Sequence, residues 1–483
     1  MTRRTKIVAT LGPASEHPAV IRDMITAGVD VFRLNLSHGD VESHLQRLAD
    51  VRAVAAELDK HVGVLADLPG PKIRAGRFPD GGVTLDPAAT IHLEPGHGPS
   101  DAGTIRVEYP TLLDDLKVGA HVQLGDGAIA LRITAVREDH ATATVEAGGR
   151  ANGSPGVHIP SDAMRLMTPT DEDLVLAETM AAAGVDFMAV SFVRAAADVE
   201  KVREVVGDRA DLVAKMETAS SVANLESIVE AADAIMVARG DLGIDCPIED
   251  VPHLQKRIVR HCVSEGVPVI TATQMLESMI NSPSPTRAEV SDVANAVFDG
   301  TDAVMLSGET AIGRDPVSVI NTMSTVAERA EGEASYRAWA NRLGREQRVG
   351  DFDAPERITM ALTHAASQAA IDGDVSAILC CTRTGLTARA MARFRPDATM
   401  VGLAPDASMA RRMSLIWGVD PLTVEVYTST DDMVWFAVET ALQRNEIEHG
   451  DTVLVLAGAP APARPGAERM RPATDVLRLV QVS

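Results

Sequence analysis

Short apolar runs alternate with amphipathic stretches along the first 330 residues of the chain. Residues 17–27 illustrate the second kind, because their apolar positions recur on one helical stripe, with Ser15 as the expected cap and Gly28 as the end signal. Eight near-continuous apolar strands, each followed by a helix, predict an α/β fold with a closed (β/α)8 TIM barrel. The predicted strands are residues 6–11, 29–36, 62–68, 187–192, 212–216, 234–238, 268–273 and 303–306.

The alternation breaks between the third and fourth predicted strands. Residues 70–166 are rich in Gly and Pro, and short alternating runs near 107, 122–124, 128–136 and 141–145 predict β-strands. We therefore expect a small β-barrel lid domain inserted into a catalytic barrel made of residues 1–69 and 167–337. Because the insertion follows a barrel strand, it falls on the face where barrel active sites lie, which favours a role as a lid.

A charged, Gly-containing connector at residues 338–353 precedes a further unit. Apolar runs at 375–381, 399–403, 422–426 and 452–457 predict strands with helices between them, and therefore a C-terminal α/β domain over residues 351–483. The Pro-, Ala- and Arg-rich stretch 459–472 is predicted to be a surface loop.

Composition excludes several classes of function. The formal net charge of -23 repels nucleic acid and anionic membranes, and an aromatic content of 3% leaves little for base stacking. No apolar run is long enough to span a membrane and no signal region opens the chain, so we expect a cytoplasmic protein. The four cysteines form no CxxC pair, and we expect free thiols.

Charged residues follow the predicted barrel strands, at the end where barrel active sites lie. Glu217 and Asp241 come from neighbouring strands and could bind one hard cation such as Mg²⁺, or Mn²⁺. Arg33, Arg74 and Lys215 would surround the same point, and phosphoryl transfer depends on such positioned charge. The chain has no P-loop, so this rim would handle the phosphate. The simpler alternative is a set of structural ion pairs, with Glu217 as the partner of a buried Lys215.

Several long strings resemble the pyruvate kinase family: TKIVATLGPAS (5–15), RLNLSHG (33–39), IMVARGDLGI (235–244), ATQMLESM (272–279), PTRAE (285–289) and DVANAVFDGTDAVMLSGET (292–310). The resemblance implies a barrel, an inserted lid and a C-terminal regulatory domain. It also implies transfer of the phosphoryl group of phosphoenolpyruvate to ADP, the last step of glycolysis, by a homotetramer.

The resemblance further implies a role for each matching residue. Lys215, Arg33 and Thr273 would be catalytic, and Glu217 and Asp241 would bind the divalent metal. Arg33, Gly240, Asp241 and Thr273 would bind phosphoenolpyruvate, and Asn35, Arg74 and Asp126 would face the nucleotide.

The loop after the third strand departs from the family pattern. Many members read DTKGPEIR where this chain reads DLPGPKIR, so Lys72 stands in place of a Glu. Lys at this position marks members that do not need K⁺, and its compact ammonium could replace that ion. We expect K⁺ not to be required, although a solvated Lys in a hinge is the alternative. The family's monovalent-cation pocket corresponds to Asn35, Ser37, Asp67 and the carbonyl of Leu68.

A second phosphate site is expected in the C-terminal domain. Hydroxyl groups and successive N–H groups at a strand-to-helix turn form an anion nest. Such a turn follows Cys381 and resembles the family's effector loop, so a phosphorylated allosteric effector is expected there, either a sugar phosphate or a nucleotide. A helix cap by Thr387 is the alternative. The residues concerned are Thr382, Arg383, Thr384, Gly385 and Thr387.

Two other functions remain open from the sequence. One is a different Mg²⁺-dependent barrel enzyme that uses phosphoenolpyruvate or pyruvate, although such enzymes lack the lid and third domain. The other is a non-catalytic metabolite-binding homologue, which would have no need to keep Lys215, Glu217, Asp241, Arg33 and Thr273 together.

Overall fold

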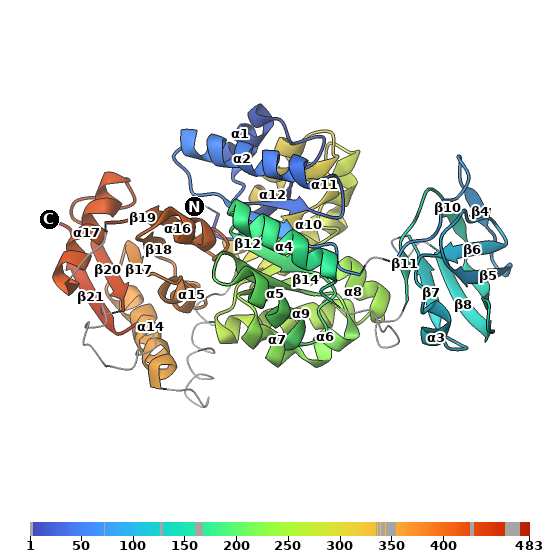
Figure 1. The fold of residues 1–483 in the computed structure, drawn as a ribbon. Helices are drawn as coiled ribbons and strands as arrows, with labels where there is room; N and C mark the ends of the chain where they lie inside the picture. The colour runs from blue at the N-terminus through green and yellow to red at the C-terminus, as the bar shows by residue number, and fades with distance from the viewer. Residues whose placement is uncertain are drawn as a thin grey trace.

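The computed structural model describes residues 3–71, 73–125, 129–159, 168–334, 336, 339, 343, 354–425, 429–458 and 474–483. A central barrel lies between the inserted domain that holds β4 to β11, drawn in teal and called the lid below, and the C-terminal domain, drawn in orange and red (Figure 1). No helix in the described part of the chain is both long and apolar enough to cross a membrane.

Eight parallel strands close the barrel in the order β1-β16-β15-β14-β13-β12-β3-β2, which confirms the predicted fold. The ends of each strand lie within two residues of the segment expected from the apolar pattern. The strands are β1 (Lys6–Thr10), β2 (Val31–Asn35), β3 (Gly63–Asp67), β12 (Phe187–Val190), β13 (Asp211–Met216), β14 (Ala234–Ala238), β15 (Val269–Ala272) and β16 (Ala303–Leu306).

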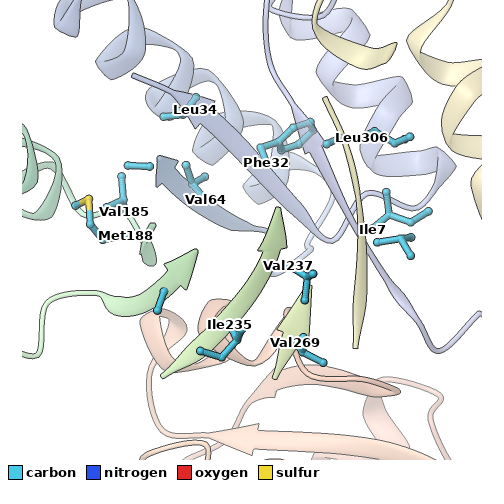
Figure 2. Close-up of a cluster of buried hydrophobic side chains, with 14 of the residues drawn as sticks. Ile7, Phe32, Leu34, Val64, Val185, Met188, Ile235, Val237, Val269 and Leu306 are labelled. Atoms are coloured by element: carbon cyan, nitrogen blue, oxygen red, sulfur yellow. The ribbon is translucent and has the colours of Figure 1, made fainter. Parts of the chain in front are cut away.

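The barrel strands are buried on both faces, which is why their sequences are apolar without alternation. Ile7 packs into the layer between strands and helices, whereas its neighbour Val8 belongs to the smaller cluster on the opposite face. Figure 2 shows the outer layer, where Phe32, Val64 and Ile235 come from three different strands. This packing fixes the strands and therefore the positions of the residues at their ends.

Helices surround the barrel, and the first of them corrects one prediction. Helix α1 is capped by His17, whose side chain accepts from the backbone N–H of Ala19, and not by Ser15. The Ser15 hydroxyl instead accepts from the N–H of Gly12. The helical elements are α1 (Pro18–Ala27), α2 (Val41–Glu57), α4 (Asp171–Ala183), α5 (Ala196–Val206), α6 (Ala219–Ala223), α7 (Leu225–Ala231), α8 (Arg239–Asp245), α9 (Val251–Glu265), the 3₁₀ helix η1 (Glu277–Ile280), α10 (Arg287–Asp299), α11 (Gly308–Ala311) and α12 (Pro316–Glu331).

The lid has its own hydrophobic core, separate from the core of the barrel. A six-stranded sheet has the order β11-β7-β8-β9-β5-β6, and β10 pairs with β4 beside it. The elements are β4 (Val83–Leu85), β5 (Thr90–Pro95), β6 (Thr104–Val107), α3 (Leu112–Asp115), β7 (His121–Leu124), β8 (Ile129–Val136), β9 (Ala141–Ala147), β10 (Gly149–Ala151) and β11 (Val157–His158).

The C-terminal domain is a five-stranded sheet of order β19-β18-β17-β20-β21 with helices packed against it. The strand predicted at 422–426 actually covers Val419–Thr423, because Val419 pairs with Met400 of the neighbouring strand. The predicted loop 459–472 lies outside the described residues. The elements are α14 (Ala354–Asp372), β17 (Ala377–Cys381), α15 (Leu386–Ala392), β18 (Thr399–Ala404), α16 (Ala407–Met413), β19 (Val419–Thr423), α17 (Thr430–Gln443), β20 (Thr452–Ala457) and β21 (Val476–Gln481).

Aspartates stand immediately before several barrel strands and fasten the base of the barrel. In each case one carboxylate oxygen accepts the N–H of the first residues of an adjacent strand, at 2.8–2.9 Å. We call this set the basal aspartates: Asp30, Asp186, Asp233 and Asp302.

Arginines of the C-terminal domain bind the same end of the barrel. Arg395 lies 2.9 Å from Asp302, and Arg411 lies 2.8 Å from Asp186. Both members of the Arg395–Asp302 pair are buried, and the Arg395 guanidinium also stacks over Trp417. The C-terminal domain is thus attached to the base, opposite the end that faces the lid (Figure 1).

Candidate active site

A cleft of about 260 Å³ opens at the carboxyl ends of the barrel strands, between the barrel and the lid. Many of the predicted site residues line it, although they come from distant parts of the sequence. From the barrel these are Arg33, Asn35, Ser37, Asp67, Lys215, Glu217 and Asp241, joined by Pro69, Ser191, Phe192 and Ile244. The lid contributes Gly125, Gly156, Val157, His158 and Ile159.

Lys215 lies at the centre of the charged group. Its Nζ is 2.7 Å from Oγ of Ser191, 2.9 Å from Oε1 of Glu217 and 3.2 Å from Oδ1 of Asp67. Burial alone would lower the pKa of Lys215, but the two carboxylates outweigh it and raise the pKa well above its usual range. The ammonium therefore places a positive charge at the centre of the cleft.

Asp67, at the end of β3, links the two principal cations of the mouth. Its Oδ2 accepts from Nε of Arg33 at 2.6 Å, while its Oδ1 faces Lys215. Burial would raise the pKa of Asp67, but Lys215 and Arg33 together lower it. Arg33 also donates to Oγ1 of Thr10 at 3.1 Å, so its guanidinium is fixed by two partners.

Glu217 is the carboxylate best suited to a metal ion. Its Oε2 accepts the N–H of Phe192 at 2.6 Å, whereas its buried Oε1 faces the Lys215 ammonium at 2.9 Å without forming a hydrogen bond of regular geometry to any described residue. Burial raises the pKa of Glu217 to about 7, with Lys215 opposing the shift and Asp241 adding to it. A cation between Glu217 and Asp241 would satisfy this oxygen and remove the repulsion.

The donor set therefore fits Mg²⁺, which takes one or two protein carboxylates and completes its octahedron with substrate oxygens and water. No group of three or more His, Cys, Asp or Glu side chains that could hold a metal occurs among the described residues. A site with two carboxylates falls below that number of side chains and offers the oxygen ligands that Mg²⁺ prefers.

Thr273 and Gly240 lie together beside the cleft. Oγ1 of Thr273 accepts the N–H of Gly240 at 2.9 Å and donates to the carbonyl of Ala272 at 2.6 Å. Thr273 and Gln274 have φ values of 67° and 54°, a left-handed conformation that is uncommon outside glycine and that concentrates at functional sites. Gly240 directly precedes Asp241, so this pair adjoins the predicted metal site.

The remaining predicted residues have different positions. Arg74 donates to the carbonyl of Ser154 within the lid and is absent from the described residues that line the cleft. The carbonyl of Leu68 accepts from the Ser191 hydroxyl at 2.7 Å. Lys72 and Asp126 lie outside the described residues.

The predicted effector loop follows β17. Thr382 and Thr387 are buried, and the Thr387 hydroxyl is 3.0 Å from that of Thr474. Arg383 and Thr384 are exposed, and Gly385 has a φ of 76°, which a glycine adopts without strain. The turn therefore offers Arg383 and Thr384 to solvent while Thr387 anchors it from inside.

Sequence reasoning missed Ser191, Phe192 and His158. Ser191 and Phe192 directly follow the fourth barrel strand, so they would have been found among the residues after the strand ends. They were missed because the predicted strand 187–192 included them. His158 belongs to a two-residue strand of the lid that gives no periodic signal.

A closed barrel with an inserted lid, and a mouth that gathers cations around paired carboxylates, defines a phosphotransferase of the barrel type. Residues 2–320 match the family model described as pyruvate kinase, barrel domain, and residues 360–471 match pyruvate kinase, alpha/beta domain. The chain belongs to the pyruvate kinase family.

Similar proteins cover nearly the whole chain. A pyruvate kinase of Methylorubrum extorquens is 41% identical, over 97% of this chain and 96% of its own length. One from Geobacillus stearothermophilus is 40% identical over 95% of this chain and 78% of its own, and one from Clostridium acetobutylicum is 37% identical over 95% and 96%. Members of this family act on phosphoenolpyruvate and ADP and use a divalent metal ion.

Proposed function

We propose that this chain transfers the phosphoryl group of phosphoenolpyruvate to ADP, giving pyruvate and ATP, and thereby catalyses the last step of glycolysis in the cytoplasm. The observation that carries the proposal is the position of Lys215, a charged ammonium held among Ser191, Asp67 and Glu217 at the centre of the cleft. Lys215 and Arg33 would stabilise the negative charge of the phosphoryl group during its transfer.

Other groups would hold and orient the substrate. The N–H groups of Gly240 and Asp241, together with Thr273, would bind the carboxylate of phosphoenolpyruvate, and Thr273 lies on the route by which the enolpyruvate is protonated. Glu217 and Asp241 would hold Mg²⁺ or Mn²⁺, which when bound neutralises charge on the transferring group. Protonation of the enol to the ketone then draws the reaction toward ATP.

The nucleotide would bind where the barrel and the lid approach each other. Asn35 lines the cleft from the barrel, and the lid supplies the backbone of Gly125 and Gly156 on the opposite side. Arg74 and Asp126 are proposed to contact ADP as the lid closes, and closure would exclude water from the reacting phosphate.

Two observations support activity without K⁺. The carbonyl of Leu68 is engaged by the Ser191 hydroxyl, and both oxygens of Asp67 face cationic side chains. These groups would otherwise coordinate a monovalent cation with Asn35 and Ser37. We propose that the Lys72 ammonium completes the replacement of that ion.

The first test is pyruvate formation by the purified protein from phosphoenolpyruvate, ADP and Mg²⁺, with and without K⁺. Turnover in both buffers supports the full proposal, and turnover with K⁺ alone overturns only the role of Lys72. A Lys72→Glu variant should then become K⁺-dependent. Pyruvate without ATP would favour a different phosphoenolpyruvate-using enzyme, and no turnover in either buffer would favour a non-catalytic homologue.

Regulation and assembly complete the proposal. The loop with Thr382, Arg383, Thr384, Gly385 and Thr387 would bind the phosphate of an allosteric effector, and the chain would form a homotetramer. Light scattering after size-exclusion chromatography tests the assembly. Sugar phosphates and nucleotides should raise turnover at low phosphoenolpyruvate in the wild type and lose that effect in Arg383→Ala if the loop binds them.

A further inference from the structure

Ser191 occupies a strand-end position that the reaction outlined above does not use. It directly follows β12 and is only 2% exposed. Its Oγ lies 2.7 Å from Nζ of Lys215, 2.7 Å from the carbonyl oxygen of Leu68 and 3.4 Å from Oδ1 of Asp67. A Lys ammonium has donors only, so the Ser191 oxygen must accept from Lys215 and its proton is directed to Leu68.

The environment leaves this side chain little freedom. A Cβ built on Gly70 would lie 2.9 Å from Cβ of Ser191, so the backbone at Gly70 packs closely against this side chain. On the other side, the Thr168 hydroxyl donates to the Ser191 carbonyl at 2.8 Å. The next residue, Phe192, has a φ of 55° and donates its N–H to Glu217. Two consecutive residues thus present a hydroxyl to Lys215 and an N–H to Glu217.

The three N–H donors of Lys215 face three acceptors, namely Ser191, Asp67 and Glu217. A phosphoryl group can be held by this ammonium only if one acceptor is released. Glu217 is the one with another proposed partner, because it would hold the divalent ion. Asp67 is retained by Arg33, and Ser191 carries no charge that a metal would attract.

We propose that Ser191 is a positioning residue for phosphoryl transfer. It keeps the Lys215 ammonium directed at the transferring group when Glu217 turns to the metal, and it acts through Lys215 without contacting the substrate. This inference rests on the proposed function.

The test is the Ser191→Ala variant. Loss of one of two remaining anchors leaves Lys215 charged but poorly directed, so kcat should fall roughly 10- to 100-fold, the usual effect of removing a residue that orients a catalytic group. KM for phosphoenolpyruvate and ADP should stay within about threefold, because ground-state binding uses other groups. Binding of Mn²⁺, measured by electron paramagnetic resonance, should be unchanged because Glu217 and Asp241 are intact.

Thr168→Val is the matched control. It removes a buried hydroxyl that bonds to the same residue but leaves the Ser191 side chain in place. Both variants should lower the melting temperature to a similar extent, while only Ser191→Ala should lower kcat. In the Lys215→Met background, Ser191→Ala should cause no further loss of the residual rate.

The inference is overturned if Ser191→Ala keeps kcat within threefold of the wild type, or if Thr168→Val loses as much activity. A wild-type protein that makes no pyruvate would instead remove the proposed function before the variants are compared.

Discussion

Both ends of the barrel bury carboxylates beside cations, but they satisfy them differently. At the base, Asp302 accepts the N–H of Val269 with one oxygen and the Arg395 guanidinium with the other, each at 2.9 Å. At the mouth, Oε1 of Glu217 forms no hydrogen bond of regular geometry to any described residue and faces the Lys215 ammonium at 2.9 Å, while that ammonium is shared among three side chains. Buried polar groups that are fully bonded stabilise a fold, whereas an unsatisfied one indicates a site for a ligand.

The difference follows from what each end of a parallel strand presents. Strand starts expose backbone N–H groups, and an aspartate placed there binds them without any ligand, as Asp30 and Asp186 do. Strand ends expose carbonyl oxygens, which are poor partners for carboxylates. Asp67 is therefore paired with cations, and Glu217 faces Lys215 with one oxygen while the other accepts the N–H of Phe192 in the turn after β12. Variants at the two ends should therefore separate activity from stability.

The largest effect is expected at the mouth, in Lys215→Met. Loss of a cation that stabilises a phosphoryl transition state should lower kcat by about 10³- to 10⁵-fold. Destabilisation should be limited, because Glu217, whose pKa burial raises to about 7, can take up a proton. Steady-state kinetics and Mn²⁺ binding check this, with binding retained. Unchanged turnover would refute the catalytic role of Lys215.

Arg395→Met should show the opposite profile at the base. The variant keeps an unbranched apolar side chain but removes the guanidinium that stacks over Trp417, and it leaves the Asp302 carboxylate buried without its cation. Breaking such a pair should lower the free energy of unfolding by about 3 kcal/mol. Urea unfolding measures that loss, and kcat at 25 °C should stay within about threefold of the wild type. A hundredfold fall in kcat with full stability would contradict the comparison.

A smaller effect is expected from pH at Asp30. Burial alone would raise its pKa, but Arg3, Lys6 and the N–H of Ile7 outweigh burial and lower it below 3.8. Because the folded-state pKa is lowered, the carboxylate stabilises the protein above pH 3.8, and this contribution is lost as pH falls through the lower value. Unfolding free energies measured across that range should depend less on pH in Asp30→Asn than in the wild type. Equal slopes would show that these cations do not act on Asp30.

The smallest effect is expected for a pair outside both ends. Arg22 and Glu57 form an ion pair between α1 and α2, with 42% and 59% of their side chains exposed. Water and salt screen such pairs, so Arg22→Gln should change the free energy of unfolding by less than about 0.5 kcal/mol. Urea unfolding in low and high salt provides the measurement. A loss as large as that of Arg395→Met would mean that burial does not separate the two classes of pair.

The barrel could be predicted because its strands are buried on both faces. A continuous apolar run needs no partner to be recognised, and the segments 234–238 and 303–306 match β14 and β16 at both ends. The prediction for the strand that is β19 was three residues too far along the chain. Asp420 and Pro421 interrupt the apolar pattern there, but pairing with β18 makes these residues part of the strand.

The charged residues of the site could be predicted from the sequence, but the hydrogen bonds among its side chains could not. Glu217, Asp241 and Lys215 were found because barrel chemistry lies at strand ends. Nothing in the sequence shows that Ser191 binds the Lys215 ammonium, since the two residues are brought together by the pairing of β12 with β13. Likewise, only the folded chain shows Thr387 turned inward toward Thr474.

The independent core of the lid also has a consequence for the order of folding. Strands β3 and β12 pair side by side although roughly 120 residues lie between Leu65 and Phe187, and closing so long a loop costs entropy before any contact is gained. If the insertion folds first, it brings the two strands close together and shortens the loop that their pairing must close. The N–H of Gly70, before the insertion, then donates to the carboxylate of Asp173, after it. The remaining barrel strands can afterwards pair in turn, because short connections join them.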